Sequence, residues 1–356
     1  MNSINLENTY TSLPQEFFRY TEAETMPDVK LIKINEQLAD LLDIDIGFLT
    51  SQTGLRFLSG KNTENFPYSI SLAYAGHQFG HLVPQLGDGR AVLLGDKICQ
   101  DGVRRDIQLK GSGKTYFSRG GDGRAGIGPV IREYLISESM HHLGVPTTRS
   151  LAVLLTGEKV VRAEVSPGAM LARVATSHVR VGTFEFFAIR NQKDHIRKLA
   201  DFMIERSHPD LSDKKEKYEL FFERIVKGQA SLVAQWNSVG FIHGVMNTDN
   251  TSISCETIDY GPCAFMDSYE ANKVFSSIDQ YGRYAFSNQS RVAPWNLSRL
   301  AETILFLISK NTSDAIKVVE EILFDFDKNF NNSLDILSSR KLGLKNNSKK
   351  TSSLYS

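Results

Sequence analysis

The spacing of hydrophobic residues changes along this chain near residue 185. Before that point, a glycine-rich turn leads into an apolar run that ends at Leu94. Further short apolar runs predict β-strands over 105–110, 151–155, 159–164 and 170–174. After it, apolar residues recur every three or four positions and predict helices over 193–206, 216–237, 297–310 and 313–330. The pattern therefore predicts an α+β protein in which most strands precede most helices.

Two more helices are expected within the strand-rich part. Residues 35–42 place their leucines on one helical face, and residues 1–70 otherwise resemble an irregular leader. A longer helix is predicted over 128–143. Pro129 lies in its first turn and Gly144 follows its last, which is the usual punctuation of a helix.

A polar loop follows the 216–237 helix. The sequence His-Gly-Val-Met-Asn-Thr-Asp-Asn over 243–250 places Asp249 beside Asn250, and a strand-like run over 251–258 leads to Asp259 in a glycine-containing turn. Carboxylate and amide oxygens from two adjacent turns suit a divalent cation that carries phosphates. Protein kinases use the same layout. The alternative is a polar turn after a buried helix.

The position of the kinase catalytic aspartate holds an aliphatic residue here. In kinases that aspartate lies five residues before the metal-binding asparagine, which in this chain is Val245. Valine cannot accept a proton, so an ordinary protein kinase is disfavoured. Asp249 is the available candidate for a base.

Three glycine-containing segments suggest phosphate contacts. Gly87 and Gly89 surround a polar residue and would let backbone N–H groups approach a phosphate, although a tight hairpin explains them equally well. Residues 111–115 resemble a P-loop, but Gln108 stands where that motif needs its first glycine. Residues 121–126 satisfy GxGxxG, but lack the acidic residue about twenty positions later that a dinucleotide-binding fold requires.

Four charged residues offer further contacts. Lys110 ends a predicted strand and Glu133 lies near the start of the next helix, an arrangement that kinases use to fix a phosphate-binding lysine. Glu133 could instead interact with the positive end of that helix. Arg173 and Arg180 lie where strands give way to helices and could hold a phosphate; surface salt bridges are the alternative.

A pair of histidines is the candidate for a different metal site. His77 and His81 have the i, i+4 spacing of a helical metal pair. No glutamate accompanies them as in the zinc-protease motif, and Gly76 and Gly80 weaken a helix. A structural role is therefore favoured over a metal site.

Composition narrows the class of protein. The chain has 356 residues, with 41 basic and 41 acidic side chains, so net charge provides no general attraction to nucleic acid or anionic membrane. The length allows two domains. Three cysteines without a CxxC pair favour a reducing compartment. No signal peptide or membrane span is recognisable, so we expect a cytoplasmic protein.

Several long motifs resemble those of the selenoprotein O (SelO, also YdiU) family, in the same order. They occupy 74–80 (YAGHQFG), 85–90 (QLGDGR), 108–114 (QLKGSGK), 117–124 (FSRGGDGR), 179–185 (VRVGTFE) and 243–250 (HGVMNTDN). The resemblance continues through 292–301 and fades near 345.

This resemblance implies a protein-kinase-like fold of two lobes, with a mostly β small lobe that contains one key helix and a helical large lobe. The expected divisions are an N-terminal extension over 1–70, a small nucleotide-binding lobe over 71–180, a large lobe over 181–342 and a disordered tail over 343–356. Similar proteins continue beyond 345, some to a redox-active cysteine or selenocysteine. The chain is therefore expected to be truncated, and redox control through a terminal cysteine is not supported.

The implied activity is transfer of AMP from ATP to hydroxyl groups of protein Ser, Thr or Tyr side chains, including its own, with release of pyrophosphate. ATP would lie in the sense opposite to that in kinases, so that its α-phosphate faces the acceptor. The implied nucleotide contacts are Gly87, Gly89, Arg90, Lys110, Asp122, Gly123, Arg173, Arg180 and Asp259. Asn250 and Asp259 would bind Mg²⁺, or Mn²⁺, Glu133 would support Lys110, and Asp249 would accept the proton.

Two related functions remain open at this stage. One is transfer of UMP from UTP with Mn²⁺. The other is an inactive ATP-binding pseudokinase scaffold, because of the expected truncation. The expected partners are ATP and protein substrates, without nucleic acid or membrane.

Overall fold

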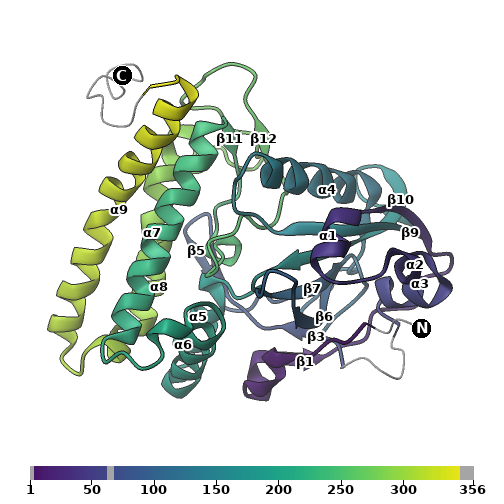
Figure 1. Cartoon of the computed structure of the whole chain (residues 1–356), viewed down its shortest axis with the longest axis horizontal. Helices are drawn as coiled ribbons and strands as arrows, with labels where there is room; N and C mark the ends of the chain where they lie inside the picture. The colour runs from purple at the N-terminus through teal and green to yellow at the C-terminus, as the bar shows by residue number, and fades with distance from the viewer. Residues whose placement is uncertain (1–3, 62–67, 345–356) are drawn as a thin grey trace.

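The computed structural model describes residues 4–61 and 68–344, and it confirms the α+β class. An antiparallel sheet of eight strands lies on one side of the molecule, and three long helices, α7, α8 and α9, lie on the other (Figure 1). Its strands follow the order β1-β3-β6-β7-β10-β9-β2, with β8 paired to β10. Nine α-helices and two small hairpins occur within the described residues.

The large sheet contains β1 (Phe18–Tyr20), β2 (Lys30–Ile34), β3 (Ile70–Leu72), β6 (Ala91–Ile98), β7 (Arg104–Lys110), β8 (Ala125–Gly126), β9 (Arg149–Val161) and β10 (Val165–Ala175). The two hairpins are β4 (Gly76–Gln78) with β5 (His81–Val83), and β11 (Phe241–Ile242) with β12 (Ala264–Phe265). The helices are α1 (Glu36–Leu41), α2 (Ile46–Thr50), α3 (Gln52–Leu58), α4 (Ile127–His142), α5 (Val181–Ala188), α6 (Lys193–Ser207), α7 (Lys217–Ser238), α8 (Gln289–Ile308) and α9 (Thr312–Lys341).

Helices cover both faces of the sheet. Side chains of successive strand residues point to opposite faces. Val153 and Leu171 accordingly pack with Val130 of α4, whereas Leu154 and Met170 belong to a second core that includes residues of α1, α2 and α3. This double coverage explains why β9 and β10 are apolar along most of their length rather than alternating.

The first 70 residues form more than the predicted leader with one helix. The 35–42 helix is confirmed as α1, where the Asn35 side chain caps the first turn by accepting from the N–H of Leu38. However, α2 and α3 follow it, and β1 and β2 pair with β3 and β9 at the two ends of the sheet. Short strands of three to five residues carry too little periodicity to be recognised.

Two strand predictions are wrong. The runs predicted at 151–155 and 159–164 are not separate strands: 151–155 and 159–161 lie in the single strand β9, which continues through Gly157 (φ +76°), and 162–164 belong to the bend before β10. The run 251–258 forms no strand. It contains turns and two isolated bridges, at Ser252 and Thr257.

The helix predictions over 128–143, 193–206 and 216–237 are confirmed to within one residue as α4, α6 and α7. Helix α8 begins earlier than predicted and continues through Pro294, and α9 continues past Phe330 to Lys341. Helix α5 was not predicted. Because seven of its eight residues are buried, it lacks the polar face that marks a surface helix.

The predicted tail over 343–356 falls mostly outside the described residues. No helix within 4–61 and 68–344 is long and apolar enough to cross a membrane.

Candidate active site

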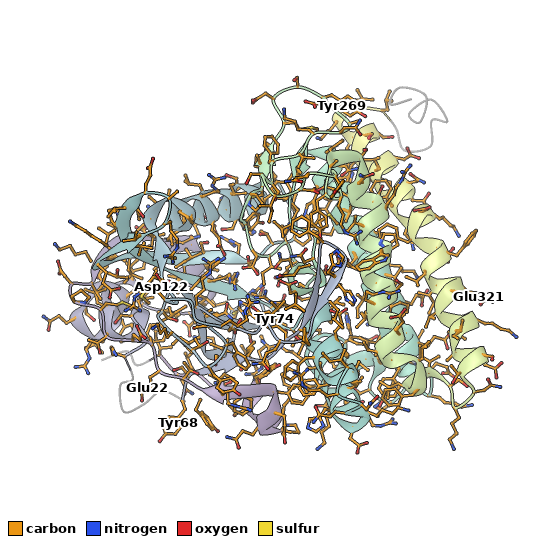
Figure 2. The ribbon with its side chains drawn as sticks, turned by 180° about the vertical axis from the view of Figure 1, so that it is seen from behind. Glu22, Tyr68, Tyr74, Asp122, Tyr269 and Glu321 are labelled. Carbon is orange, nitrogen blue, oxygen red and sulfur yellow. The ribbon has the colours of Figure 1, made fainter. Side chains whose placement is uncertain are left out.

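One cavity of about 460 Å³ brings together nearly all the predicted site residues. It lies between the sheet and the loops that precede α8, near Tyr74 at the centre of the view in Figure 2, while Asp122 lies on the sheet side. The predicted residues that line it are Gly87, Gly89, Arg90, Lys110, Asp122, Gly123, Arg173, Arg180, Asp249, Asn250 and Asp259. Glu133 lies behind this lining, on α4.

The predicted ion pair between Lys110 and Glu133 is present. Lys110 Nζ lies 2.6 Å from Glu133 Oε2 and 3.0 Å from Asp259 Oδ1. Strand β7 ends at Lys110, and α4 directs Glu133 inward, where it is 3% exposed. The carboxylate of Glu133 therefore fixes the position of Lys110. An interaction of Glu133 with the positive end of the helix is not needed to explain why it lies there.

Three cationic side chains converge on Asp259. Besides Lys110, Arg173 Nη1 lies 2.7 Å from Oδ1 and Arg180 Nη1 lies 2.7 Å from Oδ2. Burial of Asp259 would raise its pKa, but these three cations hold the pKa well below the usual range of a carboxyl. Asp259 also has a positive φ of 62°, a sparsely populated backbone conformation for a non-glycine residue.

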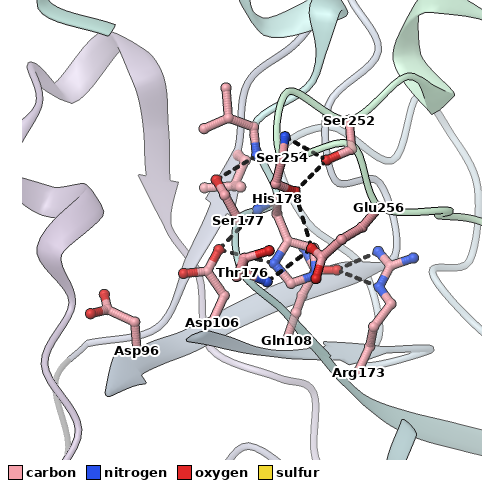
Figure 3. A network of polar contacts seen from close by, with 12 residues as sticks. Asp96, Asp106, Gln108, Arg173, Thr176, Ser177, His178, Ser252, Ser254 and Glu256 are labelled. Atoms are coloured by element: carbon pink, nitrogen blue, oxygen red, sulfur yellow. Dashed lines mark hydrogen bonds and ion pairs between the residues drawn. The ribbon is translucent and has the colours of Figure 1, made fainter. Parts of the chain in front are cut away.

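The two arginines are buried, so the surface salt-bridge interpretation is wrong. Each is 2% exposed. Arg173 donates through Nε and Nη2 to Gln108 Oε1, as the paired dashed lines in Figure 3 show. Arg180 stacks on the ring of Tyr74 at 4.6 Å and donates to the backbone oxygen of Asp249 at 2.8 Å. Their guanidinium groups are thus fixed at the cavity wall.

The glycine-rich turns form another wall of the cavity. At Gly87 (φ +79°) a Cβ would lie 2.3 Å from the ring of Phe117, and at Gly123 (φ +68°) it would lie 1.9 Å from the backbone oxygen of Gly113. Both positions therefore require glycine. The backbone of Arg90 joins this wall to β7, because its oxygen accepts from the N–H of Gly111 at 2.7 Å.

Asp122 forms a bidentate ion pair with Arg162, at 2.8 and 2.7 Å. This hydrogen bonding lowers the pKa of Asp122 to about 2. The contact fixes the 120–124 loop to the turn between β9 and β10. Arg162 was not predicted, because it is an isolated arginine in a turn.

Asp249 is buried at the cavity edge, with 7% of its surface exposed. Its Oδ2 accepts from Gln78 Nε2 at 3.2 Å, whereas Oδ1 has no hydrogen-bond partner among the described residues. Burial raises the pKa of Asp249 to about 6, although Arg180 opposes the shift. A carboxylate with a pKa in this range suits a general base.

The metal-ligand chemistry fits a hard cation. Asn250 Nδ2 donates to the backbone oxygen of Val245 at 2.9 Å, which leaves the carbonyl oxygen of Asn250 as its free acceptor. Within the described residues, no three His, Cys, Asp or Glu side chains form a metal site by themselves. A cation held by Asn250 and Asp259 would therefore need phosphate oxygens or water as its other ligands, as Mg²⁺ commonly does.

The two histidines do not share a helix. His77 and His81 lie on opposite strands of the β4–β5 hairpin, where His81 pairs with Gln78. His77 Nδ1 instead lies 2.5 Å from Glu185 Oε1. The structural interpretation of His77 agrees with this contact.

Sequence reasoning also missed Asp88, Gln108 and Gln78. Asp88 lines the cavity, and burial raises its pKa to about 6; its Oδ2 accepts from Gln108 Nε2 at 3.0 Å. All three lie inside the motifs at 74–80, 85–90 and 108–114. Only their place in those motifs could have indicated a role in the site, because a single buried polar residue produces no periodic pattern in the sequence.

Comparison with known proteins identifies the family. The family described as "Protein adenylyltransferase SelO" matches residues 1–355. The chain belongs to the SelO family. The match confirms the resemblance that the motifs indicated. It includes every residue that lines the cavity.

Several bacterial proteins named protein nucleotidyltransferase YdiU are similar along nearly the whole chain. The protein from Bradyrhizobium sp. (strain ORS 278) is 54% identical over 338 residues, which is 95% of this chain and 69% of the relative. The protein from Rhodopseudomonas palustris (strain BisB5) is 52% identical with the same coverage. That from Nitrobacter hamburgensis is 52% identical over 341 residues, which is 96% of this chain and 68% of the relative.

Proposed function

We propose that this member of the SelO family transfers AMP from ATP to hydroxyl groups of protein Ser, Thr and Tyr side chains, including its own. Family membership supports nucleotidyl transfer. The observation that carries the proposal is the cavity, where buried cations surround Asp259 and the candidate base Asp249 lies at the edge. ATP is the donor and pyrophosphate the product.

The charge of the cavity supports a triphosphate ligand. Seven cationic side chains line it, namely Arg90, Lys110, Arg119, Arg124, Arg162, Arg173 and Arg180. Four carboxylates oppose them, those of Asp88, Asp122, Asp249 and Asp259. The excess of positive charge stabilises a polyanion in a site that is partly shielded from water.

We also propose the protein-kinase-like arrangement for this fold. The sheet with α4 corresponds to the small lobe over 71–180, extended by β1 and β2, and the helices beyond 181 correspond to the large lobe. The Lys110–Glu133 ion pair and the loop that carries Asn250 ahead of Asp259 support this comparison. This chain differs from ordinary kinases in having Val245 at the position of their catalytic aspartate.

The nucleotide would lie with its β- and γ-phosphates toward Lys110, Arg173 and Arg180, and with its α-phosphate toward Asp249. The turns at Gly87 and at Asp122–Gly123 would approach the rest of the nucleotide, because both line the cavity. When bound by Asn250 and Asp259, Mg²⁺ or Mn²⁺ would neutralise phosphate charge.

The chemical step is a displacement at the α-phosphorus. The acceptor hydroxyl oxygen forms a bond to that phosphorus as the bond to the oxygen that bridges to the β-phosphate breaks. Asp249 takes the hydroxyl proton, and pyrophosphate leaves with the bridging oxygen. Lys110, Arg173 and Arg180 stabilise the charge that develops on the leaving group.

Intact-protein mass spectrometry after incubation with ATP and Mg²⁺ tests this proposal. An adduct of one or more adenylyl groups, abolished by Asp259→Ala, is the expected result. A phosphate-sized adduct would identify a kinase instead. A uridylyl adduct formed preferentially from UTP with Mn²⁺ would change the donor. ATP binding without any adduct would instead support an inactive scaffold that binds ATP.

A further inference from the structure

The β4–β5 hairpin contacts three consecutive residues of the loop that carries the candidate base. The N–H of His77 donates to Thr248 Oγ1 at 2.6 Å. Gln78 Nε2 donates to Asp249 Oδ2 at 3.2 Å. The N–H of residue 79 donates to Asn247 Oδ1 at 3.2 Å. The hairpin thus holds the 247–249 loop through both backbone and side chains.

The backbone of the hairpin is shaped around the Asp249 side chain. A Cβ at Gly76 would lie 2.5 Å from Asp249 Oδ1 and 2.9 Å from its Cγ. The absence of a side chain at this position allows the carboxyl group to pack against the strand. Because Oδ1 is buried there without a hydrogen-bond partner among the described residues, Oδ2, which accepts from Gln78, is the candidate oxygen for receiving a proton.

Contacts on both sides keep the hairpin in place. Glu185 of α5 contacts His77 Nδ1 through Oε1 and accepts from Thr248 Oγ1 through Oε2. Tyr284 Oη donates to Asn247 Oδ1 at 2.6 Å and lies 3.1 Å from the N–H of residue 79. The Gln78 amide is therefore carried on a strand that is fixed relative to the loop.

We propose that Gln78 is a positioning residue for the reaction, and that its amide fixes the Asp249 carboxylate so that one lone pair of Oδ2 faces the acceptor hydroxyl. This inference rests on the proposed function, because it assigns Asp249 as proton acceptor. A carboxylate oxygen has two lone pairs. Donation from Gln78 occupies one and leaves the other for the proton that the hydroxyl releases.

Gln78→Met tests the role of the donated hydrogen bond. Methionine has a similar length and no N–H donor. We expect kcat for self-adenylylation to fall about tenfold, the order of one lost hydrogen bond to a charged group. KM for ATP should stay within about twofold, because Gln78 is not among the residues that line the cavity. His81→Ala is the matched control, since His81 pairs with Gln78 in the hairpin but is exposed.

A double-mutant cycle with Asp249→Asn separates positioning from general loosening. If Gln78 acts through the carboxylate, Gln78→Met should cause little further loss of the residual activity of Asp249→Asn. An unchanged kcat in Gln78→Met, or a rise in KM alone, would overturn the proposal. So would a further full tenfold loss in the Asp249→Asn background.

A second cycle pairs Gln78→Met with Asp249→Ala, which leaves no side-chain oxygen for Gln78 to bond, and its four melting temperatures test the contact without needing activity. A direct contact predicts non-additive shifts, by about 2 °C or more. If no wild-type adduct formed, the proposed function would fail while this cycle still judged the contact. Additive shifts would show that Gln78 and Asp249 do not interact, whatever the activity.

Discussion

At the scale of single residues, the site depends on balanced buried charge. Lys110, Arg173 and Arg180 surround the one carboxylate of Asp259, and Glu133 supports two of the three cations. Buried cations are costly without an anion. In the ligand-free protein Asp259 supplies that anion, and the phosphates of a bound nucleotide would share the role.

Asp259→Asn should therefore destabilise the free protein more than the ATP-bound protein. We expect the free protein to melt several degrees lower, because Arg173 and Arg180 lose a buried partner. ATP should restore part of the loss, while adenylylation falls by about a hundredfold or more for want of a metal ligand. Differential scanning fluorimetry with and without ATP measures the first effect, and mass spectrometry the second. Equal melting of variant and wild type would contradict the charge argument.

Gly123 and Gly120 offer a matched pair of substitutions in one loop. Both have positive φ, of 68° and 82°. A Cβ at Gly123 would lie 1.9 Å from the backbone oxygen of Gly113, whereas at Gly120 no atom lies within 4 Å. Gly123→Ala should thus raise the Kd for ATP about tenfold, and Gly120→Ala should show only the backbone cost of about 1 kcal/mol in stability. Isothermal titration calorimetry measures the ATP affinity of both variants. Equal affinities would show that the loop accommodates a Cβ at Gly123 without disturbing the ATP site.

At the scale of elements, long periodic segments were predictable and short or fully buried ones were not. Helices α6 and α7 present one apolar face, so their period identified them. Helix α5 is buried on all sides, and β1 and β2 depend on partners distant in sequence. The predicted 251–258 strand failed because this segment consists of turns and irregular backbone, and it pairs with the described residues only through isolated bridges at Ser252 and Thr257.

Helix α8 contributes a buried amide that holds the loop between Met246 and Thr251. Asn296 Nδ2 donates to the backbone oxygen of Met246 and to Thr251 Oγ1, both at 2.9 Å. Asn296→Ala removes the amide that donates to the backbone oxygen of Met246 and to Thr251 Oγ1. It should therefore lower the free energy of unfolding by about 1–3 kcal/mol. Urea denaturation measures the loss. Ser298→Ala, at a half-buried position of the same helix, should change stability far less; similar losses in both variants would point to α8 itself.

At the scale of the whole molecule, the candidate site depends on residues from many separated segments. The motifs predicted which residue types matter, and the structure brings 87–90, 110, 122–123, 173, 180, 249–250 and 259 to one cavity. Contacts such as Gln78 with Asp249, or Asp122 with Arg162, join residues 40 or more positions apart. No local pattern predicts such pairs, because they arise only when the sheet and the helices pack together.

The same packing places a histidine in the polar network of Figure 3, with a consequence for stability against pH. His178 is 1% exposed, and its ring and N–H both contact Asp106. Burial lowers its pKa from 6.5 to about 4, although Asp106 opposes the shift. The unfolded chain therefore takes up a proton below about pH 6.5 that the folded protein does not accept until about pH 4.

The contribution of His178 to stability should consequently fall as the pH drops through this window, by up to about 1.4 kcal/mol per pH unit, whereas Asp88 and Asp249, whose pKa values are raised to about 6, contribute in the opposite direction. His178→Gln removes the titrating group and should make the slope of unfolding free energy against pH less positive than in the wild type between about 6.5 and 4, even if it lowers stability near neutrality by disturbing the contact with Asp106. His142→Gln, at an exposed position near the end of α4, should keep the wild-type slope. Chemical denaturation at several pH values measures these slopes, and a slope in His178→Gln equal to that of the wild type would assign the acid sensitivity to other groups.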